Sequence, residues 1–455
     1  MNHKIRHYSF WISVAGALIA LTGVLVATSL FNTANSGLPV FYASVLIPLL
    51  SGIHPNSSFL VARVCHLEMR VYFTVALQTA ALFCVTLIQM IWFSLEADSE
   101  IVHLVSRIMF LVYFVICVRY VRGEVAWSAM LWTRRLLIAV FLYGAYQLPA
   151  KLLGWPLFLD WLRNNKSYSL YGYDAAGWTS MVRSTGIFAE PAQATVPVVV
   201  AILLNLYIPV KPISKWIGWL SITLFGLTSA SRGMWLTIGG LALGYNFSRV
   251  KPLGRWLNSY RLTQVSLIVL TALLFPCWAI FASSNSDADL SQQERSGSVV
   301  LGMYMIRDSP VIGFGWNSAS TLSNDYLRDI ALPNAVNIEG EFIQNMVVSY
   351  WQQAGLAGLV LAVLPLILVW RWSTAEAGLK WGTLCSFLVA GGVGDFGYVS
   401  LTWLWMALLI NVSTIRHPAA DRLKANASSF GAGRDLPSFA STPTGFLSNV
   451  KEETC

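Results

Sequence analysis

Four arginines, from position 183 to position 307, could bind phosphate groups. They are Arg183, Arg232, Arg295 and Arg307, and we call them the arginine set. A guanidinium group presents fixed N–H donors that bind phosphate oxygens in pairs, and each charge-assisted hydrogen bond contributes about 1.5 to 3 kcal/mol. A pyrophosphate needs several such donors. The arginine set is therefore a candidate site for a pyrophosphate-bearing ligand, unless its members pair with carboxylates such as Asp308 or with lipid headgroups.

Three carboxylates are candidates for a general base beside these arginines. Glu339 and Glu341 come just before an apolar run that begins near Ile343, and Glu190 lies seven residues after Arg183. A carboxylate at the mouth of a membrane can have a raised pKa and still accept a proton. Glu190 could instead orient Arg183, and the residues alone leave the choice among the three open.

Aromatic and glycine residues accompany the arginine motifs. Trp178 belongs to an aromatic-rich segment that could stack on sugar rings or lie in the interfacial aromatic belt. Gly313, Gly315 and Trp316 follow Pro310 in a segment that cannot be regular helix. Its two glycines would allow close backbone approach to a ligand, or a re-entrant turn.

The composition places these residues in a membrane protein. Of the 455 residues, 56% are hydrophobic and 11% are charged, and the mean hydropathy is +0.59. Apolar runs repeatedly reach the roughly 18 to 25 residues that span hydrocarbon. We therefore predict an all-α fold, a polytopic helical membrane protein with about twelve transmembrane helices, near residues 9–31, 38–53, 70–95, 103–121, 131–150, 193–210, 213–230, 233–248, 262–283, 343–370, 378–395 and 397–414.

Basic residues give the expected orientation. Most of the 30 Lys and Arg fall in the N-terminus, the tail and alternate short loops, whereas the loop with Glu96, Asp98 and Glu100 is acidic. Cytoplasmic loops are enriched in Lys and Arg, so both termini are predicted to be cytoplasmic. The arginine set then lies on the outer face, against the prevailing bias, and an anionic ligand explains that placement.

The predicted domain organisation follows from this topology. Residues 1–414 form the transmembrane domain, with two long outer loops at about 151–192 and 284–342. Residues 415–455 are rich in Ser, Ala, Gly and Pro and are predicted to be a disordered cytoplasmic tail. Gly240 and Gly244 form a lone GxxxG pattern that indicates helix packing.

Several other classes of protein are disfavoured. The formal net charge of +8 reflects topology, so no nucleic acid partner is expected. The six cysteines form no disulfide framework or zinc pattern, and no cluster of carboxylates or histidines has metal-ligand spacing. We expect neither a metal nor another cofactor.

In their order, the motifs resemble those of the O-antigen ligase and polymerase superfamily of bacterial envelope glycan assembly. The similarity covers roughly residues 170–370 and lies in four segments: Arg183 to Pro191, Leu227 to Gly233, Arg295 to Trp316, and Gln344 to Gly358. The resemblance implies an all-helical membrane fold with a long outer loop over a cavity. It also implies a polyprenyl-pyrophosphate-linked glycan as donor, with its pyrophosphate held by the arginine set.

One difference favours a polymerase over a ligase. Ligases of this superfamily typically carry His-Asn where this chain has Gln344-Asn345, and Gln cannot accept a proton at neutral pH. Glu341 lies nearly one helical turn before Gln344 and could supply a carboxylate in place of the imidazole. Contacts with sugar or acceptor are assigned to Trp178, Trp316, Gln344 and Asn345.

The sequence therefore predicts an enzyme, a membrane glycosyltransferase that polymerises lipid-linked oligosaccharide repeats into O-antigen, capsule or exopolysaccharide. One alternative is an O-antigen ligase that transfers the glycan to lipid A-core. An alternative of another class is a transporter of the same lipid-linked oligosaccharide. The resemblance implies location in the bacterial inner (plasma) membrane, an active site on the periplasmic face, and two protein partners, a chain-length regulator and a flippase.

Overall fold

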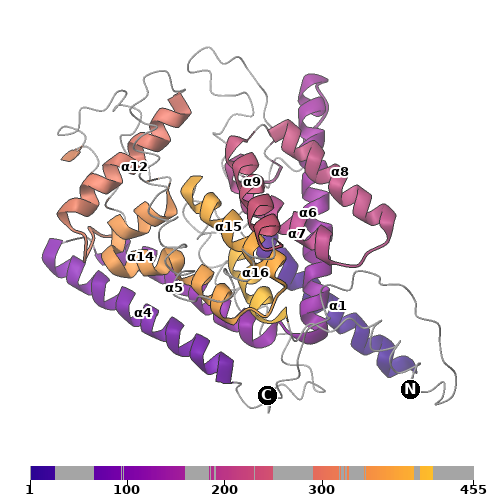
Figure 1. Ribbon diagram of the computed structural model, residues 1–455, viewed down its shortest axis with the longest axis horizontal. Coiled ribbons are helices and arrows are strands. Elements are labelled where there is room, and N and C mark those ends of the chain that lie inside the picture. The colour runs from indigo at the N-terminus through magenta and orange to yellow at the C-terminus, as the bar shows by residue number, and fades with distance from the viewer. Residues whose placement is uncertain are drawn as a thin grey trace.

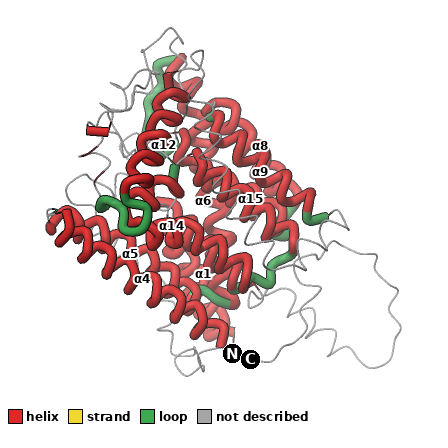
Figure 2. The backbone as a smooth tube through the Cα atoms, turned by 60° about the vertical axis from the view of Figure 1, so that its left-hand side comes forward, coloured by secondary structure: helices red, strands yellow, loops and turns green. Residues whose placement is uncertain are grey.

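The computed structural model describes residues 2–25, 66–93, 95, 97–158, 184, 186–188, 191–229, 231–249, 290–316, 318, 322, 325–326, 343, 345–393 and 400–412. Every regular element within these ranges is a helix (Figures 1 and 2). The elements are α1 (Asn2–Leu25), α4 (His66–Phe93), α5 (Ala97–Tyr120), α6 (Gly123–Leu152), the short 3-10 helix η3 (Pro191–Ala194), α7 (Thr195–Tyr207), α8 (Pro212–Ser229), α9 (Arg232–Phe247), α12 (Leu290–Asp308), α14 (Met346–Trp372), α15 (Ala377–Val393) and α16 (Ser400–Ile410).

Four of the described helices are long and apolar enough to cross a membrane. They are Met69–Phe93, Glu100–Tyr120, Gly123–Leu152 and Met346–Trp372. Shorter apolar helices occupy Phe10–Val24, Thr195–Tyr207 and Ser400–Ile410. The all-helical class is therefore confirmed for the described residues, and the four long apolar helices support a membrane protein. The total of twelve spans stays a prediction. The runs at 38–53 and 262–283 lie outside the described residues, and the helices Thr195–Tyr207 and Ser400–Ile410 are shorter than the four candidates.

The long helices differ in how deeply they are buried. Helix α14 packs against α4, α12, α15 and α16 and buries most of its side chains. Helix α4 lies at the periphery of the bundle in Figure 1 and exposes large apolar side chains such as Phe73, Ile91 and Trp92. An exposed apolar face suits contact with hydrocarbon, where lipid rather than water surrounds the helix.

One helix falls where the sequence predicts a loop. Helix α12 (Leu290–Asp308) occupies part of the predicted outer loop at 284–342. The helix has no long apolar run, so it carries no signal for a membrane span. Its C-terminal end leads into the segment Ser309–Trp316, whose loop is drawn in green beside α14 and α5 in Figure 2.

Helices α9 and α15 pack closely along the predicted GxxxG motif. A Cβ atom on Gly240 would lie 2.9 Å from Val389 Cγ2 and 3.2 Å from the Cys385 carbonyl oxygen, and one on Gly244 would collide with the Trp381 carbonyl. The packing role of this motif is confirmed. Because residue numbers rise along α9 as they fall along the facing part of α15, the two helices are antiparallel.

This contact generates a stability prediction. Gly244→Val should lower the midpoint of thermal unfolding by several degrees, because the added atoms force the two helices apart at a cost of about 1 to 3 kcal/mol. The midpoint is measured by tryptophan fluorescence of the protein in detergent. Gly239→Ala is the matched control, since no atom lies within 4 Å of its new Cβ. An equal loss in both variants would contradict a specific close contact.

Candidate functional site

The structure describes only part of the predicted site. Arg232, Arg307, Trp316 and Asn345 are described with their side chains, and Arg295 is placed only as a residue of α12. The other candidates lie outside the described residues, and their roles stay predictions: Arg183, Glu190, Trp178, Glu339, Glu341 and Gln344.

Helix α14 is broken in its first half. Ala354 has φ −128° and ψ 25°, and Gly355 has φ 57° and ψ −142°, neither of which is helical. A break of this kind leaves backbone N–H and C=O groups without helical partners, and hydrocarbon offers no water to replace them. Any stable arrangement must therefore supply those partners from elsewhere in the protein.

The segment Val311–Gly315 supplies them. Phe314 N donates to Gln352 O (3.0 Å) and Gly315 N to Gln353 O (2.9 Å), while Leu356 N donates to Val311 O (3.1 Å). The backbone of the segment after Arg307 thus pairs with the backbone of the segment after Asn345. The sequence indicated these two motifs separately. The pairing fixes the loop against the broken helix.

Glycines are required at this contact on both sides. Gly313 has φ 75°, and a Cβ there would lie 2.6 Å from Gly355 N and 2.7 Å from Gln353 O. A Cβ on Gly355 would collide with the Val311 carbonyl. Of the two glycines predicted to permit close backbone approach, Gly313 does so, and the approaching backbone belongs to α14.

Side chains from α4 and from α14 itself complete the pairing. Gln89 Nε2 donates to Ile312 O (2.6 Å) and to Gln353 O (2.7 Å), so one amide on α4 holds both the loop and the broken helix. Trp351 Nε1 donates to Pro310 O (2.8 Å), and Gln78 Nε2 donates to Ala357 O (2.8 Å) beyond the break. These amides in otherwise apolar spans are the signal that the sequence offered for the contact.

Trp316 ends the loop inside the protein. Its side chain is 2% exposed, its indole Nε1 donates to Thr86 Oγ1 (2.9 Å), and its backbone N donates to Glu100 Oε2 (2.7 Å). The sequence assigns Trp316 to sugar contact. In the observed arrangement this residue anchors the loop to α4 and α5, with both of its N–H groups engaged, and the sugar contact stays a prediction.

Arg107 lies directly behind this anchor. Its side chain is 2% exposed and donates a hydrogen bond to the Tyr350 hydroxyl. The guanidinium carbon is 4.2 Å from the centroid of the Tyr350 ring and 5.8 Å from that of the Trp316 ring. Aromatic faces attract a cation when water is excluded. Arg107 thereby joins α5 to both the loop and α14.

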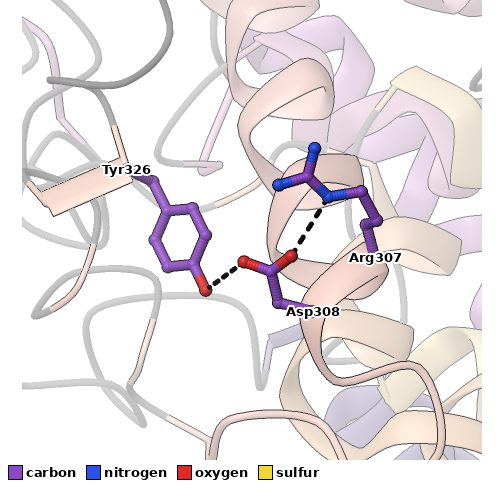
Figure 3. Close-up of polar contacts among 3 residues, drawn as sticks. All are labelled: Arg307, Asp308 and Tyr326. Carbon is purple, nitrogen blue, oxygen red and sulfur yellow. Dashed lines mark hydrogen bonds and ion pairs between the residues drawn. The ribbon is translucent and has the colours of Figure 1, made fainter.

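Arg307 has a different environment, at the end of α12 (Figure 3). Its Nε is 3.1 Å from Asp308 Oδ1, and the Tyr326 hydroxyl donates to Asp308 Oδ2 at 3.1 Å. The Tyr304 ring lies 5.1 Å from the guanidinium carbon. Arg307 remains largely exposed, so its pairing with Asp308 leaves other N–H donors accessible to an anion.

The segments Arg183 to Pro191 and Leu227 to Gly233 meet through a backbone hydrogen bond. Ser184 N donates to Thr228 O (3.1 Å), three residues before Ser231, which caps the N-terminus of α9 through Met234 N (3.4 Å). Arg232 is the first residue of α9 and is exposed. The residue that follows Arg183 is therefore held beside the segment that presents Arg232.

A buried glutamine on α6 binds Gly186 of the segment Arg183 to Pro191. Gln147 Nε2 donates to Gly186 O (2.7 Å), and Gly186 N donates back to Gln147 Oε1 (2.9 Å). Gly186 has φ 64° and packs beside Phe225. A paired amide contact of this kind fixes both position and orientation. The sequence analysis missed Gln147, whose signal was a lone amide in a predicted span.

Asn345 connects this region to α14. Its side-chain oxygen accepts a hydrogen bond from Val348 N (3.0 Å), so Asn345 caps the N-terminus of α14. Its side-chain nitrogen donates to Gly392 O (3.3 Å) near the end of α15. Because α9 and α15 are antiparallel, Arg232 begins α9 at the same end of the pair where Gly392 lies. Residues from three of the four predicted motifs therefore gather at one end of the α9–α15 pair.

The described helices define a class: an all-helical protein with four helices suited by length and composition to cross a membrane. No family model matches the chain, and the comparison with curated proteins found no match. Within the described ranges, no group of three or more His, Cys, Asp or Glu side chains could hold a metal ion.

The anchor at Trp316 generates a prediction about dynamics. Glu100→Ala removes the acceptor of the Trp316 N–H, and a hydrogen bond to a charged group contributes about 1.5 to 3 kcal/mol. Hydrogen exchange of peptides that contain residues 310–316 should accelerate by about tenfold or more. Asp98→Ala, an exposed carboxylate in the same first turn of α5, should leave the exchange unchanged. Unaltered exchange in Glu100→Ala would refute the anchoring role.

Proposed function

We propose that this chain is a membrane glycosyltransferase that polymerises polyprenyl-pyrophosphate-linked oligosaccharide repeats into a surface polysaccharide. The observation that carries the proposal is the hydrogen bond from Ser184 N to Thr228 O. It places Ser184, which follows Arg183, beside the segment of Arg232, although the two arginines are 49 positions apart in the sequence. In the proposal, Arg183 and Arg232 each supply one guanidinium group to a ligand with two linked phosphates.

The start of α9 adds to the attraction for an anion. Arg232 occupies the first helical position behind the Ser231 cap, where the positive end of the helix dipole favours negative charge. An anion here would meet both the arginine and the helix end. In the proposed reaction, these groups stabilise the charge that develops on the departing pyrophosphate.

The reaction needs no nucleotide. A hydroxyl oxygen of one repeat unit attacks the anomeric carbon of the reducing-end sugar on a second carrier lipid, and a new glycosidic C–O bond forms. The bond from that carbon to the pyrophosphate oxygen breaks, and its electron pair leaves with the polyprenyl pyrophosphate. The hydroxyl proton passes to a carboxylate, for which Glu341 is our first candidate and Glu339 and Glu190 are the others.

A transporter of the same lipid-linked sugar is the second candidate, and one observation favours it. Discontinuous transmembrane helices are common in transporters, and α14 is broken at Ala354–Gly355. In this chain, however, backbone of the segment 311–315 pairs with the broken helix. That pairing suits a fixed scaffold better than a moving gate, so we favour the glycosyltransferase.

The arginines provide the first test. Purified protein in lipid, with chelator, is incubated with a polyprenyl-pyrophosphate repeat unit, and product length is followed on a gel. Arg232→Ala should reduce chain extension by about tenfold to a hundredfold, the equivalent of one lost charge-assisted hydrogen bond. Arg183→Ala should act similarly, and Arg371→Ala, at the end of α14, is the control.

The pattern of products separates the candidates. A ladder that the control retains and the two arginine variants lose supports the polymerase. Transfer that begins only when a separate acceptor such as lipid A-core is added would replace it with the ligase. If no acceptor yields a product while vesicles still move the lipid-linked sugar between leaflets, the transporter is favoured.

The carboxylate provides the second test. Glu341→Gln keeps the size of the side chain but cannot take up the hydroxyl proton at neutral pH, so extension should fall by about a hundredfold or more. Binding of the donor, measured by equilibrium titration, should be unchanged. A Glu341→Gln protein with normal activity removes this residue from the role, and Glu339→Gln and Glu190→Gln are then compared in the same assay.

A further inference from the structure

A second arginine is buried between helices α6, α7 and α8. Arg134 is 3% exposed, and its Nε and Nη2 donate to Asn205 Oδ1 at 3.1 and 2.7 Å. It also donates to the hydroxyl of Ser214 at 3.0 Å and to the carbonyl of Ser214 at 2.6 Å. Gly218 permits this packing, because a Cβ there would lie 2.5 Å from Asn205 Oδ1. The arginine therefore joins three helices.

Every acceptor of Arg134 is neutral. The hydrogen bonds satisfy its N–H groups, but they do not balance its charge. The sequence from Val125 to Leu152 and from Thr195 to Ser229, which covers almost all of α6 and the whole of α7 and α8, contains no Asp or Glu. The next residue in the sequence, Arg135, is a further cation.

Two lysines extend this positive charge to the surface. Lys211 is exposed just before α8, and Lys215 is half-buried one turn later. The backbone of Lys215 belongs to the same network, since its carbonyl accepts from Asn205 Nδ2 (3.1 Å). Arg134, Arg135, Lys211 and Lys215 form what we call the basic cluster. No ion pair involves any of the four within the described part of the chain.

Aromatic and apolar side chains accompany residues of the basic cluster. The Arg135 guanidinium carbon is 4.9 Å from the centroid of the Trp132 ring. Trp216 and Ile213 at the start of α8 are 74% and 70% exposed. Exposed tryptophan beside lysine and arginine is typical of the level of lipid headgroups, where the ring meets the acyl region and the cation meets phosphate.

We propose that the basic cluster binds the phosphate of an anionic membrane lipid, such as phosphatidylglycerol. Arg135, Lys211 and Lys215 contact the phosphate, and the exposed faces of Ile213 and Trp216 pack against the acyl chains. Arg134 adds its uncompensated charge from beneath. The lipid supplies the negative charge that the surrounding helices lack. This site is independent of the glycosyltransferase proposal, because it uses none of the residues assigned to the donor.

The test measures lipid binding directly. Purified full-length protein in neutral detergent is titrated with phosphatidylglycerol, and bound lipid is counted by native mass spectrometry. The double variant Lys211→Gln, Lys215→Gln should weaken saturable binding by about tenfold or more, because two of the cations near the phosphate are lost. The double variant Arg249→Gln, Arg371→Gln removes two exposed cations elsewhere and should bind as the unmodified protein does.

Three results would overturn the proposal. The unmodified protein could fail to bind phosphatidylglycerol saturably, or bind phosphatidylcholine equally well. The control variant could lose as much affinity as the lysine variant, which would indicate general surface charge. Inorganic phosphate at the same concentration could displace the lipid fully, which would identify a site for free phosphate. Retained folding of both variants is verified by their thermal unfolding midpoints.

Discussion

The backbone pairing between Val311–Gly315 and the break in α14 is the contact on which much of this structure depends. A membrane helix cannot leave backbone N–H and C=O groups unsatisfied, so a break at Ala354–Gly355 requires a partner segment. That need explains the glycines on both sides, the amide of Gln89, and the anchoring of Trp316. The paired loop directly follows α12, whose last turn carries Arg307.

Buried arginines at two places show how this chain accommodates charge in an apolar bundle. Arg107 contacts the hydroxyl and ring of Tyr350 and the ring of Trp316, and so stabilises the loop contact. Arg134 is bound by neutral oxygens alone and joins α6, α7 and α8. A charge costs free energy in this environment unless the protein or a ligand offsets it. Aromatic side chains of the protein offset the charge of Arg107, and in our proposal a lipid offsets the charge of Arg134.

The sequence predicted the elements whose signal is local. Long apolar runs predicted the spans at α4, α5, α6 and α14, and Gly240 and Gly244 predicted the α9–α15 contact. Other features depend on partners far away in the chain. Nothing local marks α12 as a helix in a predicted loop, and Gly355 breaks α14 only because a loop about 40 residues earlier fills the gap. Lone amides such as Gln147 acquire meaning only once their partners are known.

The candidate site also contains residues that the sequence could predict and residues that it could not. The segments of Arg183 and Arg232 could be grouped from the sequence because each carries an arginine. Their backbone hydrogen bond, from Ser184 N to Thr228 O, lies near the end of α8. The anchoring role of Trp316 could not be predicted, because an aromatic residue after two glycines suits sugar contact equally well. The roles of Arg183, Glu341 and Gln344 stay predictions.

The central claim, that Arg232 and the segment beside it bind a pyrophosphate, is tested most directly by ligand binding without turnover. Polyprenyl pyrophosphate and polyprenyl monophosphate would be titrated into the purified protein and into its Arg232→Ala variant. Our account predicts that the unmodified protein prefers the pyrophosphate and that the variant loses most of this preference. Equal affinity for both lipids, or an unchanged preference in the variant, would contradict it.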